Sequence, residues 1–321
     1  MCTLKRILQM TLYQKVKDNP KTFLSLTSLT WTEFESFVPF FEDALDQSQQ
    51  ERYQSNPKRK RKPGGGAKAT LKTSEEKFFF ILYYKKTYPL QEVLGAEFSI
   101  SQGRANIWIH KLTPILKTAL EHGGYLPERC PENVEGKLNN SLHLEFALDG
   151  TERGRQRPKD PEDRKKYYSG KKKKYTIKNN VLIDIHQRCI IYFSQTFEGK
   201  KHDKKICDEE PITFPDGSVL YLDLGYISYS PEGATIYQPR KKPRGGKRTE
   251  EDKIFNKNIS CVRIIVEHVI SGIKRFRIVK DIYRNTKKNF KDLIMEIACG
   301  LHNMRSHFRN QKEPMAIAYS E

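Results

Sequence analysis

The stretch Ile259–Phe276 reads ISCVRIIVEHVISGIKRF, and the interpretation of the rest of the chain starts from it. Apolar residues recur at helical spacing and predict an amphipathic helix with a wide buried face: Val262, Ile265, Val266, Val269, Ile270 and Ile273. The opposite face carries Arg263, Glu267, Ser271 and Lys274. Steps of four and seven residues are whole helical turns to within about 40°, so this face holds one carboxylate between two cations.

Two interpretations of this charged face are open. It could be a solvated surface with a single Arg263–Glu267 pair, which would contribute ~0.3–0.5 kcal/mol to the helix. It could also present Glu267 to a site built with other parts of the chain. The remaining sequence decides between them.

The charge of the chain points to a polyanionic partner. Lys and Arg number 58 against 39 Asp and Glu, a formal net charge of +19. Nucleic acid is the usual partner of such a surplus, and an anionic membrane surface is the alternative. No apolar run approaches the ~20 residues that span a bilayer, and the first residues lack the apolar core of a signal peptide. We therefore expect a soluble intracellular protein.

Residues 1–57 form a predicted N-terminal helical region. Its main helix covers Thr32–Gln47, in which Pro39 is expected to cause a kink or a break. Residues 58–72 are a predicted linker that is basic (KRKRK at 58–62) and rich in glycine. This linker could contact phosphates as an arm or simply be solvated.

Residues 73–140 have the layout of a helix-turn-helix followed by a connector. A helix begins near Ser74, a short helix covers Leu90–Phe98, and a turn at residues 99–101 leads into a long helix ending near His122. The early exposed face of that long helix carries side chains that can pair with base edges: Gln102, Arg104 and Asn106. An ordinary three-helix unit would share this layout.

Residues 141–310 change to a strand-rich pattern, and residues 311–321 are a tail. The run from Leu142 ends at Asp149, and three short antiparallel strands are predicted at Lys174–Lys178, Asn180–His186 and Cys189–Phe197. A buried-type strand, Ser218–Leu224, contains Asp223. A last helix, Asn289–Phe308, is expected to pack on the sheet.

The acids at the strand ends suggest a site. A strand-end aspartate is often only a cap or a turn residue, which is the simple reading of Asp149 and of Asp223. Taken with Glu267, however, the order of three antiparallel strands, a strand and a helix suggests an RNase H-like sheet. Three converging carboxylates are unfavourable unless a divalent cation neutralises them, and hard oxygen ligands suit Mg²⁺ or Mn²⁺. Two such ions would activate an attacking oxygen and stabilise a leaving one in phosphodiester transfer.

Five sequence blocks, in order, resemble a known family. They are ALDGTERGRQRP with Asp149, YYSGKKKKYTIKNN, FEGKKHDKK, YLDLGY with Asp223, and FNKNISCVRIIVEHVISGIKRF with Glu267. Together they are similar to the DDE transposases of bacterial insertion sequences, the group related to the PIF/Harbinger elements. Arg263, Glu267 and Lys274 match the family's Tyr-Arg-Glu-Lys signature, while Ser260 stands where that signature has Tyr.

The resemblance implies a fold and an activity. The fold is an α/β RNase H-like catalytic domain, with a mixed sheet and flanking helices, preceded by an all-α helix-turn-helix domain. The activity is that of a transposase, which binds the terminal inverted repeats of its element, cleaves DNA at the ends and joins the freed 3′-hydroxyl to target DNA. Asp149, Asp223 and Glu267 would be catalytic and would hold Mg²⁺ or Mn²⁺, with two ions expected.

The resemblance also implies DNA contacts. Arg263 and Lys274 would position Glu267 and bind DNA. Other cations are expected to contact phosphates: Arg164, Lys165, Lys166, Lys171, Lys172, Lys173, Lys174, Lys241 and Lys242. His202 and Asp203 could assist near the metals, or Asp203 could cap a helix.

The expected partner is double-stranded DNA, as transposon ends and as target, bound by a homodimer or a larger assembly. No membrane partner is expected, and the location would be the bacterial cytoplasm, at the nucleoid. Two alternatives share most of these features. One is a catalytically silent DNA-binding protein derived from a transposase, and the other is a stand-alone metal-dependent nuclease.

Overall fold

The computed structural model describes residues 10–55, 69–242 and 245–310. The chain divides into two compact units, Met1–Tyr125 with Arg275–Ile278, and Leu126–Lys274 with Val279–Glu321. The basic run at 58–62 in the predicted linker and the predicted tail at 311–321 lie outside the described residues. No described helix combines the length and the apolar character needed to cross a membrane.

The first unit is helical and is built around α5. Its helices are α2 (Leu12–Val16), α3 (Pro20–Thr27), α4 (Trp31–Gln54), α5 (Ser74–Thr87), α6 (Gln91–Glu97) and α7 (Gln102–His122). The side chains from Phe78 to Lys85 are all buried, so α5 is enclosed on every side. The helices of the predicted N-terminal region therefore share one core with the predicted helix-turn-helix.

A break at Pro39, one of the two outcomes expected from the sequence, is wrong, because α4 continues through Pro39 as one helix. Proline removes one backbone hydrogen bond of a helix and crowds the preceding turn. On either side of it, Phe37 and Phe41 are fully buried, with ring centroids 5.4 and 5.0 Å from that of Phe78. Tertiary packing of this aromatic face holds the helix through the proline.

The predicted short helix, turn and long helix are confirmed as α6 and α7. Ser99 in the turn has a left-handed φ of 54°, and the Ile100 N–H donates to the Gly95 carbonyl at 2.9 Å. A Cβ on Gly95 would lie 2.6 Å from the Ile100 carbonyl oxygen. The absence of a side chain at Gly95 therefore lets the turn fold this tightly against α6.

The second unit contains a mixed seven-stranded sheet in the order β2-β3-β1-β6-β7, with β4 and β5 also paired to β3. The strands are β1 (Glu145–Gly154), β2 (Tyr168–Ser169), β3 (Lys174–Asp184), β4 (Cys189–Phe193), β5 (Phe197–Glu198), β6 (Ser218–Leu222) and β7 (Ala234–Tyr237). Strand β1 is antiparallel to β3 and parallel to β6, which is in turn parallel to β7. This arrangement confirms the RNase H-like α/β fold.

The predicted strands Lys174–Lys178 and Asn180–His186 are one continuous strand, β3, which corrects the sequence interpretation. The two predicted strands were separated at Asn179, but the side chains of Asn179 and Asn180 are both buried. The Asn179 amide donates to the carbonyls of Ser194 and Gln195, and the Asn180 amide donates to that of Asp203. Because these polar groups are satisfied, they can lie inside the sheet.

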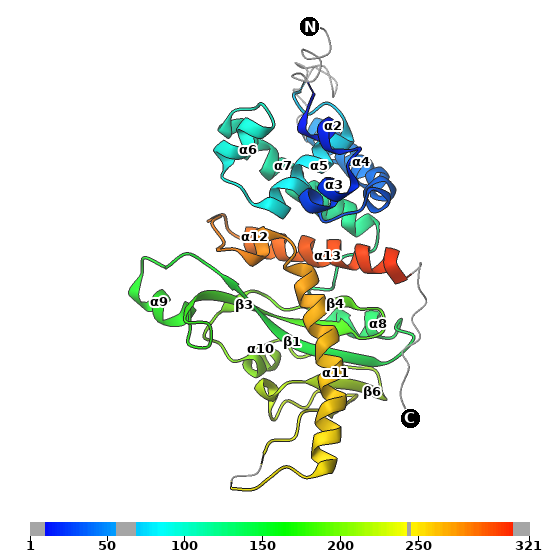
Figure 1. Ribbon diagram of the computed structural model, residues 1–321, viewed down its shortest axis with the longest axis vertical. Coiled ribbons are helices and arrows are strands. Elements are labelled where there is room, and N and C mark those ends of the chain that lie inside the picture. The colour runs from blue at the N-terminus through cyan, green and yellow to red at the C-terminus, as the bar shows by residue number, and fades with distance from the viewer. Residues whose placement is uncertain (1–9, 56–68, 243–244, 311–321) are drawn as a thin grey trace. The chain divides into compact units, whose positions relative to one another are not determined.

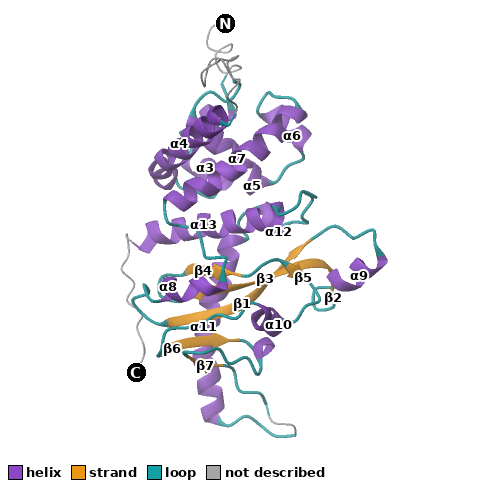
Figure 2. Cartoon of the chain, turned by 180° about the vertical axis from the view of Figure 1, so that it is seen from behind, coloured by secondary structure: helices purple, strands orange, loops and turns teal. Residues whose placement is uncertain are grey.

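Helices cover both faces of the sheet (Figures 1 and 2). On one face lies α11 (Glu250–Ile273), and on the other lie α8 (Val134–Leu138) and α10 (Asp203–Glu209). The predicted C-terminal helix is confirmed as α13 (Phe290–Asn310), which packs on β4 and on α11. The remaining short elements are η1 (Pro131–Asn133), α9 (Pro161–Tyr167), η2 (Leu224–Tyr226) and α12 (Arg277–Lys280).

The apolar core of this unit fills the side of the sheet under α8 and α10. It includes Phe146 and Leu148 of β1 and Leu220 and Leu222 of β6. Side chains alternate along a strand, so Asp149 points to the opposite face, where α11 lies. The fold thus places Asp149 on the face covered by α11, opposite this core.

The buried Lys85 of α5 generates a stability prediction. Its ammonium has Thr113 Oγ1 as a partner at 3.4 Å, and burial lowers the pKa of Lys85 to about 7. The unfolded lysine titrates near ~10.4, so the unfolded chain binds more protons between these values and stability should rise with pH in that window. Lys85→Met should raise the free energy of unfolding at about pH 6.5 by roughly 1–3 kcal/mol and should flatten this pH dependence.

Chemical denaturation of the full chain at about pH 6.5 and about pH 9 measures this effect. Lys21→Met, at an exposed position on α3, is the matched control and should change stability by less than about 0.5 kcal/mol. Equal responses of the two variants would show that the buried ammonium carries no cost.

Candidate active site

The pairing of β1 with β6 places Asp149 beside Asp223. The predicted strand end at Asp149 is wrong, because β1 continues to Gly154, whereas Asp223 directly follows the last residue of β6. The two strands are parallel, and Leu148 pairs with Leu222. Asp149 and Asp223 are the next residues of the two strands, so they emerge side by side. Asp223 is also the N-cap of η2 and accepts a hydrogen bond from the Gly225 N–H. Asp223 is therefore a capping residue, as its simple reading expected, because one of its carboxylate oxygens accepts this local hydrogen bond.

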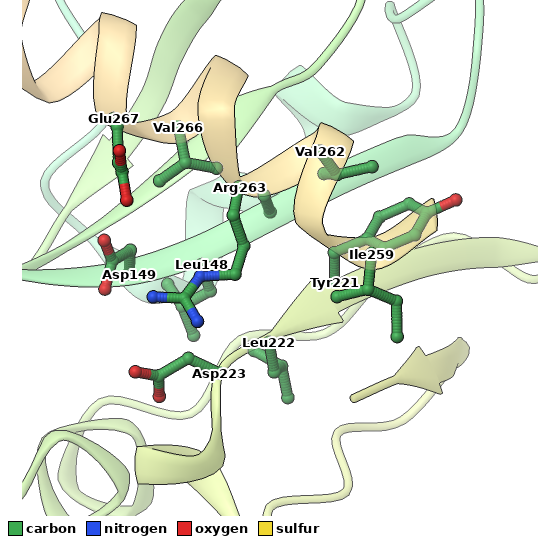
Figure 3. A pocket seen from close by; sticks show the side chains of 11 residues that line it. Leu148, Asp149, Tyr221, Leu222, Asp223, Ile259, Val262, Arg263, Val266 and Glu267 are labelled. Carbon is green, nitrogen blue, oxygen red and sulfur yellow. The ribbon is translucent and has the colours of Figure 1, made fainter. Parts of the chain in front are cut away.

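Helix α11 brings Glu267 to the same place. Val266, Val269 and Ile273 bury one side of α11, as the apolar spacing predicted, while Glu267 stays exposed. The other predicted residues of this face are half-buried: Val262, Ile265 and Ile270. One pocket is lined by Ala147, Leu148, Asp149, Tyr221, Leu222, Asp223, Ile259, Val262, Arg263, Val266 and Glu267. Figure 3 shows Glu267 pointing from α11 toward Asp149. The acids that the sequence singled out thus share a single pocket.

Arg263 enters this pocket from the helical turn before Glu267. Its guanidinium lies between Asp149 and Asp223 in Figure 3, and its positive charge lowers the pKa of Asp149. Among the ion pairs of the described residues there is none between Arg263 and Glu267. The i,i+4 pair considered from the sequence is therefore not formed, and Arg263 faces Asp149 and Asp223 instead.

Asp149 experiences a strongly unfavourable environment for a charge. Burial is the largest effect, and together with the negative charges of Asp223 and Asp203 it raises the pKa of Asp149 to about 6. A hydrogen bond from the Gly150 N–H to Asp149 Oδ1, at 2.7 Å, and the charge of Arg263 act in the opposite direction. The pocket therefore has excess negative charge that a bound cation would relieve.

Asp203 lies next to these acids from the other side of the sheet. It is the first residue of α10, while His202 is the N-cap and makes no side-chain capping bond. A Cβ on Gly150 would overlap Asp203 Oδ1, and one on Gly225 would lie 3.4 Å from Asp203 Oδ2. Two glycines thus make room for this carboxylate. His202 is exposed and does not line the pocket.

A buried lysine that the sequence analysis did not single out holds Asp203. Lys178 Nζ lies 3.1 Å from Asp203 Oδ1 and 3.9 Å from Glu152 Oε1, and it donates to the Lys201 carbonyl at 2.9 Å. Lys178 pairs with Glu152 across β3 and β1. The alternation of Thr176, Lys178 and Asn180 could have indicated a polar side of β3. The ion pair itself depends on the pairing of β3 with β1 and on the register between them.

The predicted DNA-contacting cations are distributed outside the pocket, apart from Arg263. Lys274 is the C-cap of α11; burial lowers its pKa, as do the charges of Lys172 and Lys174. The other exposed cations flank the β2–β3 hairpin or lie in the loop before α11: Lys165, Lys166, Lys171, Lys172, Lys173, Lys174, Lys241 and Lys242. Arg164 differs, because its guanidinium donates to the carbonyls of Pro158 and Lys159.

The predicted base-reading residues lie in the helical unit, at the start of α7. Gln102 and Arg104 are exposed there, and Asn106 is half-buried. They belong to the helix that follows the tight turn, which is the position expected for them.

The donor set of the pocket fits a hard divalent cation, since it consists of carboxylates with a surplus of negative charge. Within residues 10–55, 69–242 and 245–310, however, no three acidic, histidine or cysteine side chains are already arranged to hold a metal ion.

The Lys178 ion pairs generate a prediction about the frame of this site. Lys178→Met would leave Asp203 and Glu152 without their cation, and should lower the free energy of unfolding by about 3 kcal/mol because both carboxylates are largely buried. Lys165→Met removes the exposed pair with Glu162 and should cost less than about 1 kcal/mol. Denaturation of the two full-length variants measures the difference, and similar losses would contradict a buried role for Lys178.

Comparisons with known proteins identify families that are similar to both parts of the chain. The family described as DDE superfamily endonuclease matches residues 148–303, and the helix-turn-helix of DDE superfamily endonuclease matches residues 69–122. The chain is also 27% identical over 210 residues, covering 65% of this chain and 72% of the relative, to a probable transposase for insertion sequence element IS702 from Microchaete diplosiphon. No solved structure matches the chain significantly. With both domains matched in order and the acids gathered in one pocket, the chain belongs to the DDE superfamily of transposases.

Proposed function

We propose that this transposase binds the terminal inverted repeats of its element, cleaves DNA at the ends and joins the freed 3′-hydroxyl to target DNA. The observation that carries the proposal is the pocket in which Asp149 of β1, Asp223 after β6 and Glu267 of α11 meet. The DDE superfamily endonuclease match to residues 148–303 contains all three acids.

In this proposal Asp149, Asp223 and Glu267 hold Mg²⁺ or Mn²⁺, with two ions expected. When bound, such ions supply an activated attacking oxygen and stabilise the leaving oxygen of the phosphodiester. Arg263 balances the charge of the two aspartates, and its long side chain can turn toward DNA phosphates instead. Asp203, held by Lys178, adds negative charge beside Asp149 and is an accessory to the site.

DNA binding is divided between the two units. Exposed lysines around the β2–β3 hairpin and in the loop before α11 contact phosphates, which fixes register but reads no sequence. Gln102, Arg104 and Asn106 of α7 read bases. Two ends must be brought together for transfer, so a homodimer or a larger assembly acts on DNA, at the nucleoid in the bacterial cytoplasm.

The experiment that tests this function is cleavage of labelled DNA carrying the element's own flanking inverted repeats, with Mg²⁺, with Mn²⁺ and without metal. Metal-dependent nicks at the repeat ends support the transposase. Tight binding to the repeats without nicks favours the catalytically silent DNA-binding protein. Cleavage of any DNA, without preference for the repeats, favours the stand-alone nuclease.

The carboxylates should be separable from DNA binding by substitution. Asp149→Asn, Asp223→Asn and Glu267→Gln should each reduce strand cleavage by a factor of at least about 10³, because each removes one charged ligand, while affinity for repeat DNA stays unchanged. Asp216→Asn, an exposed aspartate in the turn before β6, is the matched control and should cleave normally. Full cleavage by any of the three variants would remove that residue from the site.

The hairpin lysines should carry sequence-independent affinity. Replacing Lys171 and Lys172 together by alanine should weaken binding to random duplex DNA and lower the slope of log affinity against log salt by ~2, about 0.9 for each phosphate that is no longer neutralised. Lys204→Ala is the control, because its charge is already paired with Asp208 at 2.7 Å. The slopes come from titrations in chelator at several salt concentrations. An unchanged slope in the double variant would show that Lys171 and Lys172 do not contact DNA phosphates.

A further inference from the structure

A third amide ties together two of the residues proposed to read bases. Gln91 begins α6, and its Oε1 accepts one hydrogen bond from Gln102 Nε2 at 2.7 Å and another from Asn106 Nδ2 at 3.2 Å. Gln102 and Asn106 are four residues apart on α7, so they lie on the same face. A single oxygen on the first helix of the motif therefore fixes two side chains of the second.

These bonds determine what the two amides can still offer. Each amide nitrogen has two N–H groups and gives one to Gln91, so each amide keeps one N–H donor and its carbonyl acceptor. One donor beside one acceptor is the pattern that pairs with N7 and N6 of adenine in the major groove. Ordering the long Gln102 side chain on binding to DNA would cost conformational entropy. Because Gln91 already holds this side chain, part of that entropy cost is removed before binding.

The surface around the two amides is open and partly apolar, which suits contact with bases. Ile107 follows Asn106 and is 57% exposed, although it is apolar. The position of a Cβ on Gly103 has no atom within 4 Å among the described residues, so the helix surface beside Gln102 is open. An exposed branched aliphatic side chain suits the methyl group of thymine, which is the partner of adenine.

We propose that Gln91 is a positioning residue that sets base specificity: it holds Gln102 and Asn106 to read adenines, and Ile107 contacts a neighbouring thymine methyl. The ligand of this surface is an A·T-containing stretch of major groove. This inference rests on the DNA-binding half of the proposed function and is independent of whether the chain cuts DNA.

The test is selection from a library of random DNA duplexes by the full-length protein in chelator, followed by affinity measurements on the selected sequence. The wild-type protein should select adenines at two positions, and each adenine should be preferred about fivefold to a hundredfold. Gln91→Met has a similar volume but no acceptor, and it should lose this preference at both positions while random DNA is bound as before. Gln50→Met, an exposed glutamine on α4, is the matched control and should keep the preference.

A conservative variant separates positioning from bulk affinity. Gln91→Glu keeps the acceptor for both amides, so it should keep the adenine preference even though its negative charge weakens binding to every sequence. Replacing the selected adenines by 7-deazaadenine removes the N7 acceptor; wild-type affinity should fall, and Gln91→Met should show no further fall. This probe also tests the pairing on wild-type protein if Gln91→Met fails to fold.

Three results would overturn the inference. They are an unchanged preference in folded Gln91→Met, loss of the preference in Gln91→Glu, or wild-type indifference to 7-deazaadenine. In each of these cases the proposed function stands, because the wild-type protein still selects a sequence. If the wild-type protein selects no sequence at all, then specific end binding fails, and the role of Gln91 fails with it.

Discussion

The parallel pairing of β1 with β6 is the constraint on which the candidate site depends. It makes Leu148 and Leu222 neighbours and so forces the next residues, Asp149 and Asp223, to emerge together. Two carboxylates at such a place repel one another, and burial raises the pKa of Asp149 to about 6. One cation lies on each side of the sheet. Arg263 of α11 lies between Asp149 and Asp223 (Figure 3), and Lys178 of β3 forms an ion pair with Asp203. The favourable free energy of packing the apolar core therefore offsets the cost of bringing these charges together.

Glycines mark where this assembly is tightest. Gly150 directly follows Asp149, and any side chain there would displace Asp203. Gly272 on α11 faces His302 of α13, and its carbonyl accepts from Arg305 at 2.7 Å. Close crossing of α11 and α13 fixes the helix that carries Glu267. The glycines at these two points therefore allow β1 to approach α10 and α11 to approach α13 closely.

Much of the site could be predicted because its residues sit in local patterns. Glu267 and Arg263 follow from helical periodicity, and Asp149 and Asp223 follow from the ends of apolar runs. The pairing of Lys178 with Glu152 and Asp203 could not be predicted, since it depends on strand register, which period-two alternation does not specify between strands. Two local rules were also overridden by packing. Pro39 lies within a continuous helix because Phe37 and Phe41 are buried around it, and Asn179 lies within a strand because its amide is fully bonded.

The charge of the chain cannot by itself supply recognition of a DNA sequence. A surplus of 19 positive charges draws the protein to any DNA, and this attraction contains no sequence information. In the proposed function, recognition of particular ends must therefore come from groups whose contacts differ between bases. At the start of α7 the proposed groups are Arg104 and two amides, and Gln91 ties the two amides. An amide that rotates freely offers either a donor or an acceptor at a given point, and it discriminates poorly. An amide held at one end offers both in a fixed order. In this proposal, a hydrogen bond within the protein, made before DNA binds, therefore turns a polar surface into a specific one.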